Sequence, residues 1–157
     1  MAKWIRHLYQ PCLPLGTDGK RVTGSAEHIE LSRTAAREGM VLLKNEGALP
    51  LSNGAKIALF GKASVDYVKG GGGSGDVTIK YARSLYDGLK IKEGEGKVQI
   101  FEELTDFYKE NVKSQYAEKI DPGMTEEPEL PDNLLEKVAA NADVAIVTIC
   151  RFSGEGW

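Results

Sequence analysis

The sequence has the length and composition of one ordinary globular domain. It holds 157 residues, 41% of them apolar and 27% charged, with a formal charge of −3, and such a chain can bury a single core. The negative net charge argues against a nucleic-acid partner, because phosphate-binding surfaces are basic. The longest apolar segment, residues 144–150, is far shorter than the roughly 20 residues that cross a bilayer, so no membrane partner is expected.

Residues 1–29 are predicted to form an extended N-terminal arm. Turn-forming residues cluster at Pro11, Pro14 and Asp18–Gly19, and the apolar residues show no sustained periodicity. The first residues are basic but are not followed by the apolar run of a secretory signal, which favours a cytoplasmic location. Residues 30–157 are expected to form the folded domain.

The folded part is predicted to open with an amphipathic helix over residues 30–44. Apolar residues recur there at helical spacing from Leu31 onward, with Glu30 or Ser32 as the possible first residue and Asn45–Gly47 as the end. Further elements are predicted in the order strand, helix, strand, helix and helix, followed by a last strand. Their ranges are 56–61, 81–89, 98–101, 103–119, 132–141 and 143–150.

The last strand and the alternation of elements predict the fold class. Residues 143–150 are almost continuously apolar and β-branched, which is typical of a strand buried on both faces of a parallel sheet. Helices alternating with such strands predict an α/β fold, a doubly wound and mostly parallel sheet with helices on both faces. A surface loop over residues 120–131 and a cap at Asp132 complete this prediction.

Cysteine usage indicates neither a disulfide framework nor a metal centre. Only Cys12 and Cys150 are present, far apart in the sequence, and two cysteines with two histidines at these spacings do not make a metal site. Cys150 is expected to be a buried free thiol at the end of its strand.

Two loops are expected to lie beyond the carboxyl ends of the strands, where parallel sheets bind ligands. In the first, Gly70–Gly75 formally satisfies a dinucleotide-binding glycine pattern, but it lies well past the strand end, and Asp76 stands where a phosphate loop has lysine. The loop therefore favours close backbone approach to a sugar or another domain over nucleotide binding. The alternative is a flexible surface loop without a binding role.

The second loop, residues 151–157, sets Glu155 between two glycines just after the buried strand. A carboxyl group near apolar rings such as Phe152 and Trp157 has a raised pKa, as a general acid at neutral pH requires. A solvated glutamate on a turn is the competing interpretation.

Three segments, in this order, resemble family 3 glycoside hydrolases. They are the Glu-Gly-Met-Val-Leu-Leu-Lys-Asn run of residues 38–45, the glycines and serine of residues 71–75, and Ser-Gly-Glu-Gly at residues 153–156 after the apolar strand. The resemblance covers about residues 30–157 and identifies them as a partial α/β-sandwich domain of that family.

This resemblance implies a function and a set of site residues. The function is retaining hydrolysis of terminal β-linked sugars of the β-glucosidase type, without a cofactor. Glu155 is implied as the acid/base, and Ser74 is similar to a residue that borders the sugar pocket. Gly73, Arg151 and Trp157 complete the predicted binding residues.

The sequence departs from the family pattern at both ends. Most members begin with a (β/α)₈ barrel that supplies an aspartate nucleophile, whereas this sequence enters the sandwich domain directly, as in the subgroup with reversed domain order. Family members also continue beyond the position of Trp157. The sequence is therefore expected to be a partial one. None of Asp66, Asp76 and Asp143 matches a nucleophile motif, so these residues alone are expected to be inactive. A non-catalytic carbohydrate-binding or scaffold domain is the alternative function, and a nucleotide-binding domain is the third.

Overall fold

The computed structural model describes residues 24–73, 79, 81–121 and 123–154. The chain divides into two compact units, Met1–Leu49 and Pro50–Trp157, and each is treated by itself. No helix in the described ranges is long and apolar enough to cross a membrane.

The described part of the first unit contains one helix, α1 (Ala26–Glu38). The predicted range of 30–44 is wrong at both ends. The helix starts earlier because the Ser25 side chain accepts a hydrogen bond from the backbone N–H of His28 at 3.3 Å, the usual N-cap interaction. It ends before Gly39, a poor helix former. Beyond it, the Asn45 side chain accepts hydrogen bonds from the backbone N–H groups of Gly47 and Leu49 and closes a turn.

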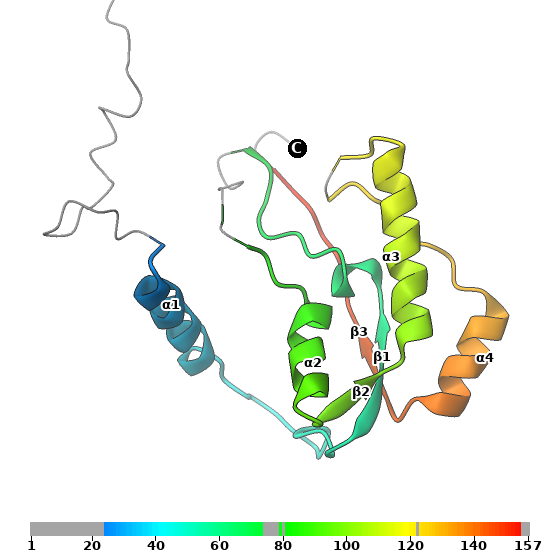
Figure 1. Cartoon of the computed structure of the whole chain (residues 1–157), viewed down its shortest axis with the longest axis horizontal. Helices are drawn as coiled ribbons and strands as arrows, with labels where there is room; N and C mark the ends of the chain where they lie inside the picture. Colours follow the sequence, from blue (N-terminus) through cyan, green and yellow to red (C-terminus); the bar gives the residue numbers. More distant parts are fainter. Residues whose placement is uncertain (1–23, 74–78, 80, 122, 155–157) are drawn as a thin grey trace, which may run out of the picture. The chain divides into compact units, whose positions relative to one another are not determined.

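The second unit is built on a three-stranded parallel sheet of β1 (Ala55–Phe60), β2 (Val98–Ile100) and β3 (Val144–Val147). The strand order is β2-β1-β3, with β1 between its two partners (Figure 1). Because β1 is central, Ile57 and Leu59 are fully buried.

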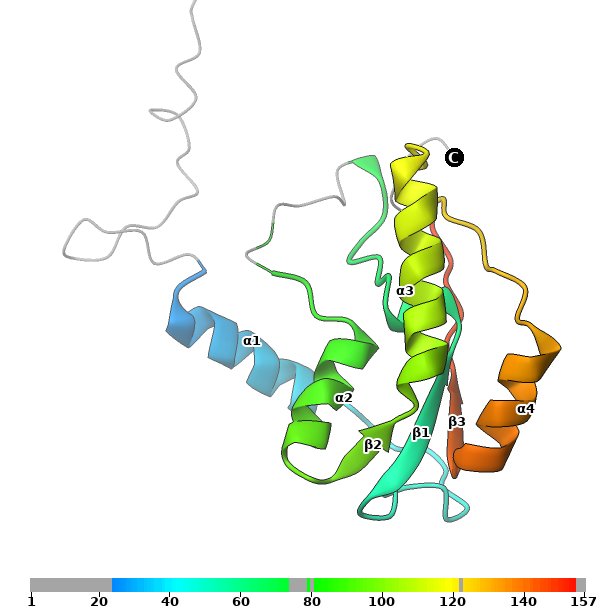
Figure 2. The ribbon, with the colours of Figure 1, turned by 45° about the vertical axis from the view of Figure 1, so that its right-hand side comes forward.

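Helices cover both faces of this sheet: α2 (Leu85–Gly94) on one, α3 (Glu102–Ala117) and α4 (Asp132–Asn141) on the other (Figure 2). Successive residues of β1 point to opposite faces, so Ala58 packs with α3 and α4 while its neighbours pack with α2. The first cluster comprises Ala58, Leu104, Tyr108, Leu134 and Val138. The second comprises Ile57, Leu59, Val98 and Ile100, with Tyr86 and Leu89 of α2 against them. The doubly wound α/β prediction is confirmed.

Two helix starts differ from the predicted ones for reasons of capping. The second helix was predicted to start at Tyr81 but starts at Leu85, because Ser84 and Asp87 form a reciprocal capping box. Asp132 was predicted as a cap, but it is the first helical residue, and Pro131 holds the cap position without a side-chain hydrogen bond.

The prediction that residues 143–150 are buried on both faces is wrong. β3 ends at Val147, which is 70% exposed, and Ile149 beyond it is 83% exposed. In the described part of the chain β3 pairs with β1 alone, so it is an edge strand. Cys150 is a free thiol as expected, but it is only partly buried, for the same reason.

Candidate active site

The two loops predicted to share one edge of the sheet are joined by backbone pairing. The Gly72 N–H donates a hydrogen bond to the Ser153 carbonyl at 3.0 Å, and Gly72 and Gly154 form an isolated parallel β-bridge. In Figure 1 the two segments run side by side beyond the carboxyl ends of β1 and β3. The strand order reverses between these two strands, where open α/β sheets form their ligand crevice.

A cavity of about 300 Å³ opens beside this junction. Its wall includes the backbone of Gly70–Gly72 and the side chains of Asp66, Tyr67, Tyr116 and Phe152. This volume lies at the lower end of the range that holds small ligands in proteins. The lining combines aromatic rings with exposed backbone, a surface that suits a sugar ring and its hydroxyl groups.

One wall of the cavity is fixed by a chain of hydrogen bonds around Asp66. The Tyr116 hydroxyl donates to the two carboxylate oxygens at 2.7 and 2.8 Å, and the Thr125 hydroxyl donates to one of them at 3.2 Å. The buried Lys62 ammonium donates in turn to that Thr125 hydroxyl at 2.6 Å and to the Thr125 carbonyl. The hydroxyl thus bridges a buried cation and a carboxylate, and such connected networks stiffen the structure around them.

The network keeps Tyr116 as a neutral donor. Burial, and secondarily the hydrogen bond to Asp66, raise the pKa of the Tyr116 hydroxyl well above its ordinary value. With its oxygens held by Tyr116 and Thr125, Asp66 is arranged to brace the cavity wall.

Replacing Tyr116 by phenylalanine is expected to lower the free energy of unfolding by about 1.5–3 kcal/mol, since a hydrogen bond to a charged group contributes that much. Urea titration of the complete protein measures the loss. Tyr81→Phe is the control, because Tyr81 is an exposed tyrosine. Equal unfolding midpoints for the two variants would contradict a stabilising role for the network.

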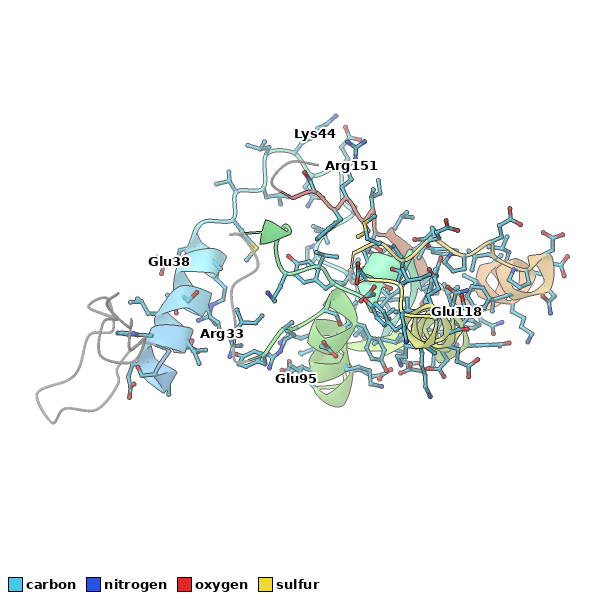
Figure 3. The ribbon with its side chains drawn as sticks, turned by 90° about the horizontal axis from the view of Figure 1, so that it is seen from above. Arg33, Glu38, Lys44, Glu95, Glu118 and Arg151 are labelled. Carbon is cyan, nitrogen blue, oxygen red and sulfur yellow. The ribbon has the colours of Figure 1, made fainter. Side chains whose placement is uncertain are left out.

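Of the predicted site residues, Glu155, Ser74 and Trp157 lie outside the described residues. Gly73 directly follows the β-bridge and has φ +73°, a conformation that favours glycine. Arg151 is exposed on the segment between β3 and the bridge (Figure 3). The roles assigned to these five residues stay predictions.

Other acidic residues are also located by the structure. Asp143 lies at the amino end of β3, where its carboxylate accepts a hydrogen bond from the Lys56 N–H at 2.9 Å, away from the crevice as expected. Among the described residues no group of three Asp, Glu, His or Cys side chains is placed to hold a metal ion.

The sequence did not reveal the network around Asp66. Its members, Lys62, Asp66, Tyr116 and Thr125, come from three separate parts of the chain, and no motif spacing links them. No sequence signal marks Thr125, because the proline-rich loop around it has the composition of a surface loop; its burial is visible only in the structure.

The chain is similar in sequence and in fold to known proteins. The family model described as the glycosyl hydrolase family 3 C-terminal domain matches residues 40–157. The chain is 55% identical over its whole length to β-glucosidase A of Butyrivibrio fibrisolvens, covering 19% of that protein. It is 36% identical to a β-glucosidase of Ruminococcus albus, covering 82% of this chain and 14% of that protein.

A similar structure has also been solved. β-Glucosidase 3B from Thermotoga neapolitana, in complex with α-D-glucose, superposes with a TM-score of 0.65 at 39% sequence identity, over 83% of this chain and 19% of that one. The chain therefore spans about a fifth or less of the length of these relatives.

Proposed function

Since this chain belongs to glycosyl hydrolase family 3, we propose that the complete protein containing it is a retaining β-glucosidase, to which this chain contributes the general acid/base, Glu155. The observation that carries the proposal is the pairing of Gly72 with Ser153 and Gly154. This pairing brings the segment that leads to Glu155 against the glycine loop and the cavity at the carboxyl edge of the sheet. The β-glucosidases similar to this chain support the same reaction class.

Retention of configuration requires two carboxyl groups about 5–5.5 Å apart on opposite sides of the glycosidic bond. In the proposed mechanism, Glu155 donates its proton to the leaving oxygen while an aspartate attacks the anomeric carbon. The resulting carboxylate of Glu155 then takes a proton from the water that releases the sugar. We propose that the aspartate belongs to a (β/α)₈ barrel outside this chain, so that these residues alone do not turn over substrate.

The substrate class that fits the proposal is a terminal β-glucoside. The aromatic lining of the cavity, from Tyr67, Tyr116 and Phe152, supports binding of a neutral sugar. Location in the cytoplasm stays a prediction, and cell fractionation with an antibody to this sequence tests it.

Proton NMR of the first turnovers of the complete protein on 4-nitrophenyl β-glucoside tests the proposed reaction. We expect β-glucose to form first, because two successive inversions retain the configuration at the anomeric carbon. The released β-glucose then converts slowly into the α-anomer in solution. Formation of α-glucose first would contradict a retaining mechanism. Binding of the sugar without cleavage would instead support a non-catalytic carbohydrate-binding domain.

A further inference from the structure

The segment from Thr148 to Gly154 meets three glycines, two from the connection between β1 and α2 and one from the connection between α3 and α4. A methyl group built on Gly61 would lie 2.3 Å from the Thr148 carbonyl oxygen. One built on Gly123 would lie 2.6 Å from the Phe152 ring, and one on Gly71 would lie 2.5 Å from the Ser153 carbonyl oxygen. Ordinary contacts of such a carbon begin at 3.4 Å, so at each of these points only glycine lets the chains approach this closely.

The first contact fixes the exit of β3. The Thr148 N–H donates to the Phe60 carbonyl at 2.8 Å, and the Thr148 hydroxyl donates to the Phe60 and Gly61 carbonyls at 2.9 and 3.1 Å. Gly61, directly after β1, has φ +91°. The chain therefore turns away from the sheet at the point where Thr148 extends beyond β3. The chain after β3 therefore leaves the sheet in a defined direction.

The second contact anchors a side chain. The Phe152 ring lies against the backbone of Gly123, which has φ +86°, and both residues line the cavity with Tyr116. Because the ring is only partly exposed, it holds its own backbone close to the loop that carries Gly123.

The third contact holds the last described peptide group before the proposed acid/base. Gly71 touches the Ser153 carbonyl, and the Gly72 N–H hydrogen-bonds to the same oxygen at 3.0 Å. The peptide between Ser153 and Gly154 is thereby fixed in orientation, and Glu155 is the next residue along the chain.

We infer that Gly71 and Phe152 are positioning residues for Glu155, acting through the backbone of Ser153 and Gly154; this inference rests on the proposed function. A general acid must reach the leaving oxygen within hydrogen-bonding distance. A methyl group at position 71 forces the Ser153 carbonyl outward, and a displacement of about 1 Å at a catalytic group costs up to about 100-fold in rate.

Gly71→Ala is the most informative substitution in this set. Unlike Gly61 and Gly123, Gly71 has no positive φ, so alanine there introduces the close contact without backbone strain. Gly88→Ala is the matched control, because Gly88 lies in α2, has no positive φ and has open space around its Cα. Alanine is also the better helix former at that position.

The experiment compares kcat/KM of the complete protein on two substrates, phenyl β-glucoside and 2,4-dinitrophenyl β-glucoside. The phenolate leaving group needs protonation, whereas dinitrophenolate leaves without it. For Gly71→Ala we expect kcat/KM on the phenyl substrate to fall about tenfold more than on the dinitrophenyl substrate. Gly88→Ala is expected to leave both values unchanged.

Equal losses on both substrates, or no loss on either, would overturn the inference, because a merely structural defect lowers both rates together. If Gly71→Ala does not fold, Phe152→Leu carries the same test, since leucine keeps an apolar side chain but loosens the contact with Gly123. Glu155→Ala is measured in parallel. If Glu155→Ala loses more kcat/KM on the phenyl than on the dinitrophenyl substrate but Gly71→Ala does not, only the positioning role is removed. If neither variant shows this difference between the substrates, the proposed function is removed as well.

Discussion

Replacing Glu155 by alanine in the complete protein is expected to lower kcat/KM on phenyl β-glucoside by about 100- to 10,000-fold, the usual contribution of a general acid. The loss on 2,4-dinitrophenyl β-glucoside should be much smaller, because that leaving group departs as a stable anion. Steady-state kinetics on a series of aryl β-glucosides measure this difference between leaving groups. In Glu155→Ala, kcat/KM should depend more steeply on the pKa of the leaving phenol.

The control for this substitution is Glu118→Ala, which removes an exposed glutamate at the end of α3 (Figure 3). We expect it to leave the leaving-group dependence as it is in the unmodified protein. If Glu155→Ala behaves like Glu118→Ala, Glu155 is not the acid.

The largest expected effect on stability comes from truncating the core. Leu104 of α3 is fully buried against Ala58 and Tyr108, so Leu104→Ala should lower the free energy of unfolding by about 2–5 kcal/mol through lost burial and the cavity left behind. Urea titration followed by circular dichroism measures the change.

Leu135→Ala provides the comparison, because Leu135 of α4 is 38% exposed. Removing a half-exposed side chain leaves no closed cavity, so a loss of about 1 kcal/mol or less is expected. A Leu104→Ala variant that unfolds at the same urea concentration as Leu135→Ala would contradict the assigned core.

Strong local patterns explain which elements the sequence predicted well. α3 and α4 have apolar residues at helical spacing, and β1 is a short apolar run closed by Gly61, so their type follows from periodicity. α1 was misplaced because the apolar residues Met40–Leu43 extend the helical pattern beyond its true end. Its boundaries depend on the Ser25 cap and on Gly39 instead.

The burial of β3 could not be predicted from its own residues. Composition tells how apolar a strand is, but the number of its neighbours in the sheet is a non-local property. β3 has the composition of a central strand and the position of an edge strand in the described residues, which leaves Val147 and Ile149 exposed.

The same distinction applies to the candidate site. The meeting of the two loops was predictable, because parallel strands place their carboxyl ends at one edge. The contacts of Gly71 with Ser153 and of Gly123 with Phe152 join residues that are distant in sequence, so the need for glycine there is visible only in three dimensions.

The configuration of the product formed by Glu155→Ala with azide tests the central claim most directly. If Glu155 is the acid/base, azide enters the space left by its carboxylate and attacks the glucosyl-enzyme intermediate. The glucosyl–aspartate bond breaks, a bond from azide to the anomeric carbon forms, and NMR should identify β-glucosyl azide. Formation of α-glucosyl azide would instead assign Glu155 as the nucleophile, and the absence of any glucosyl azide would contradict a catalytic role for Glu155.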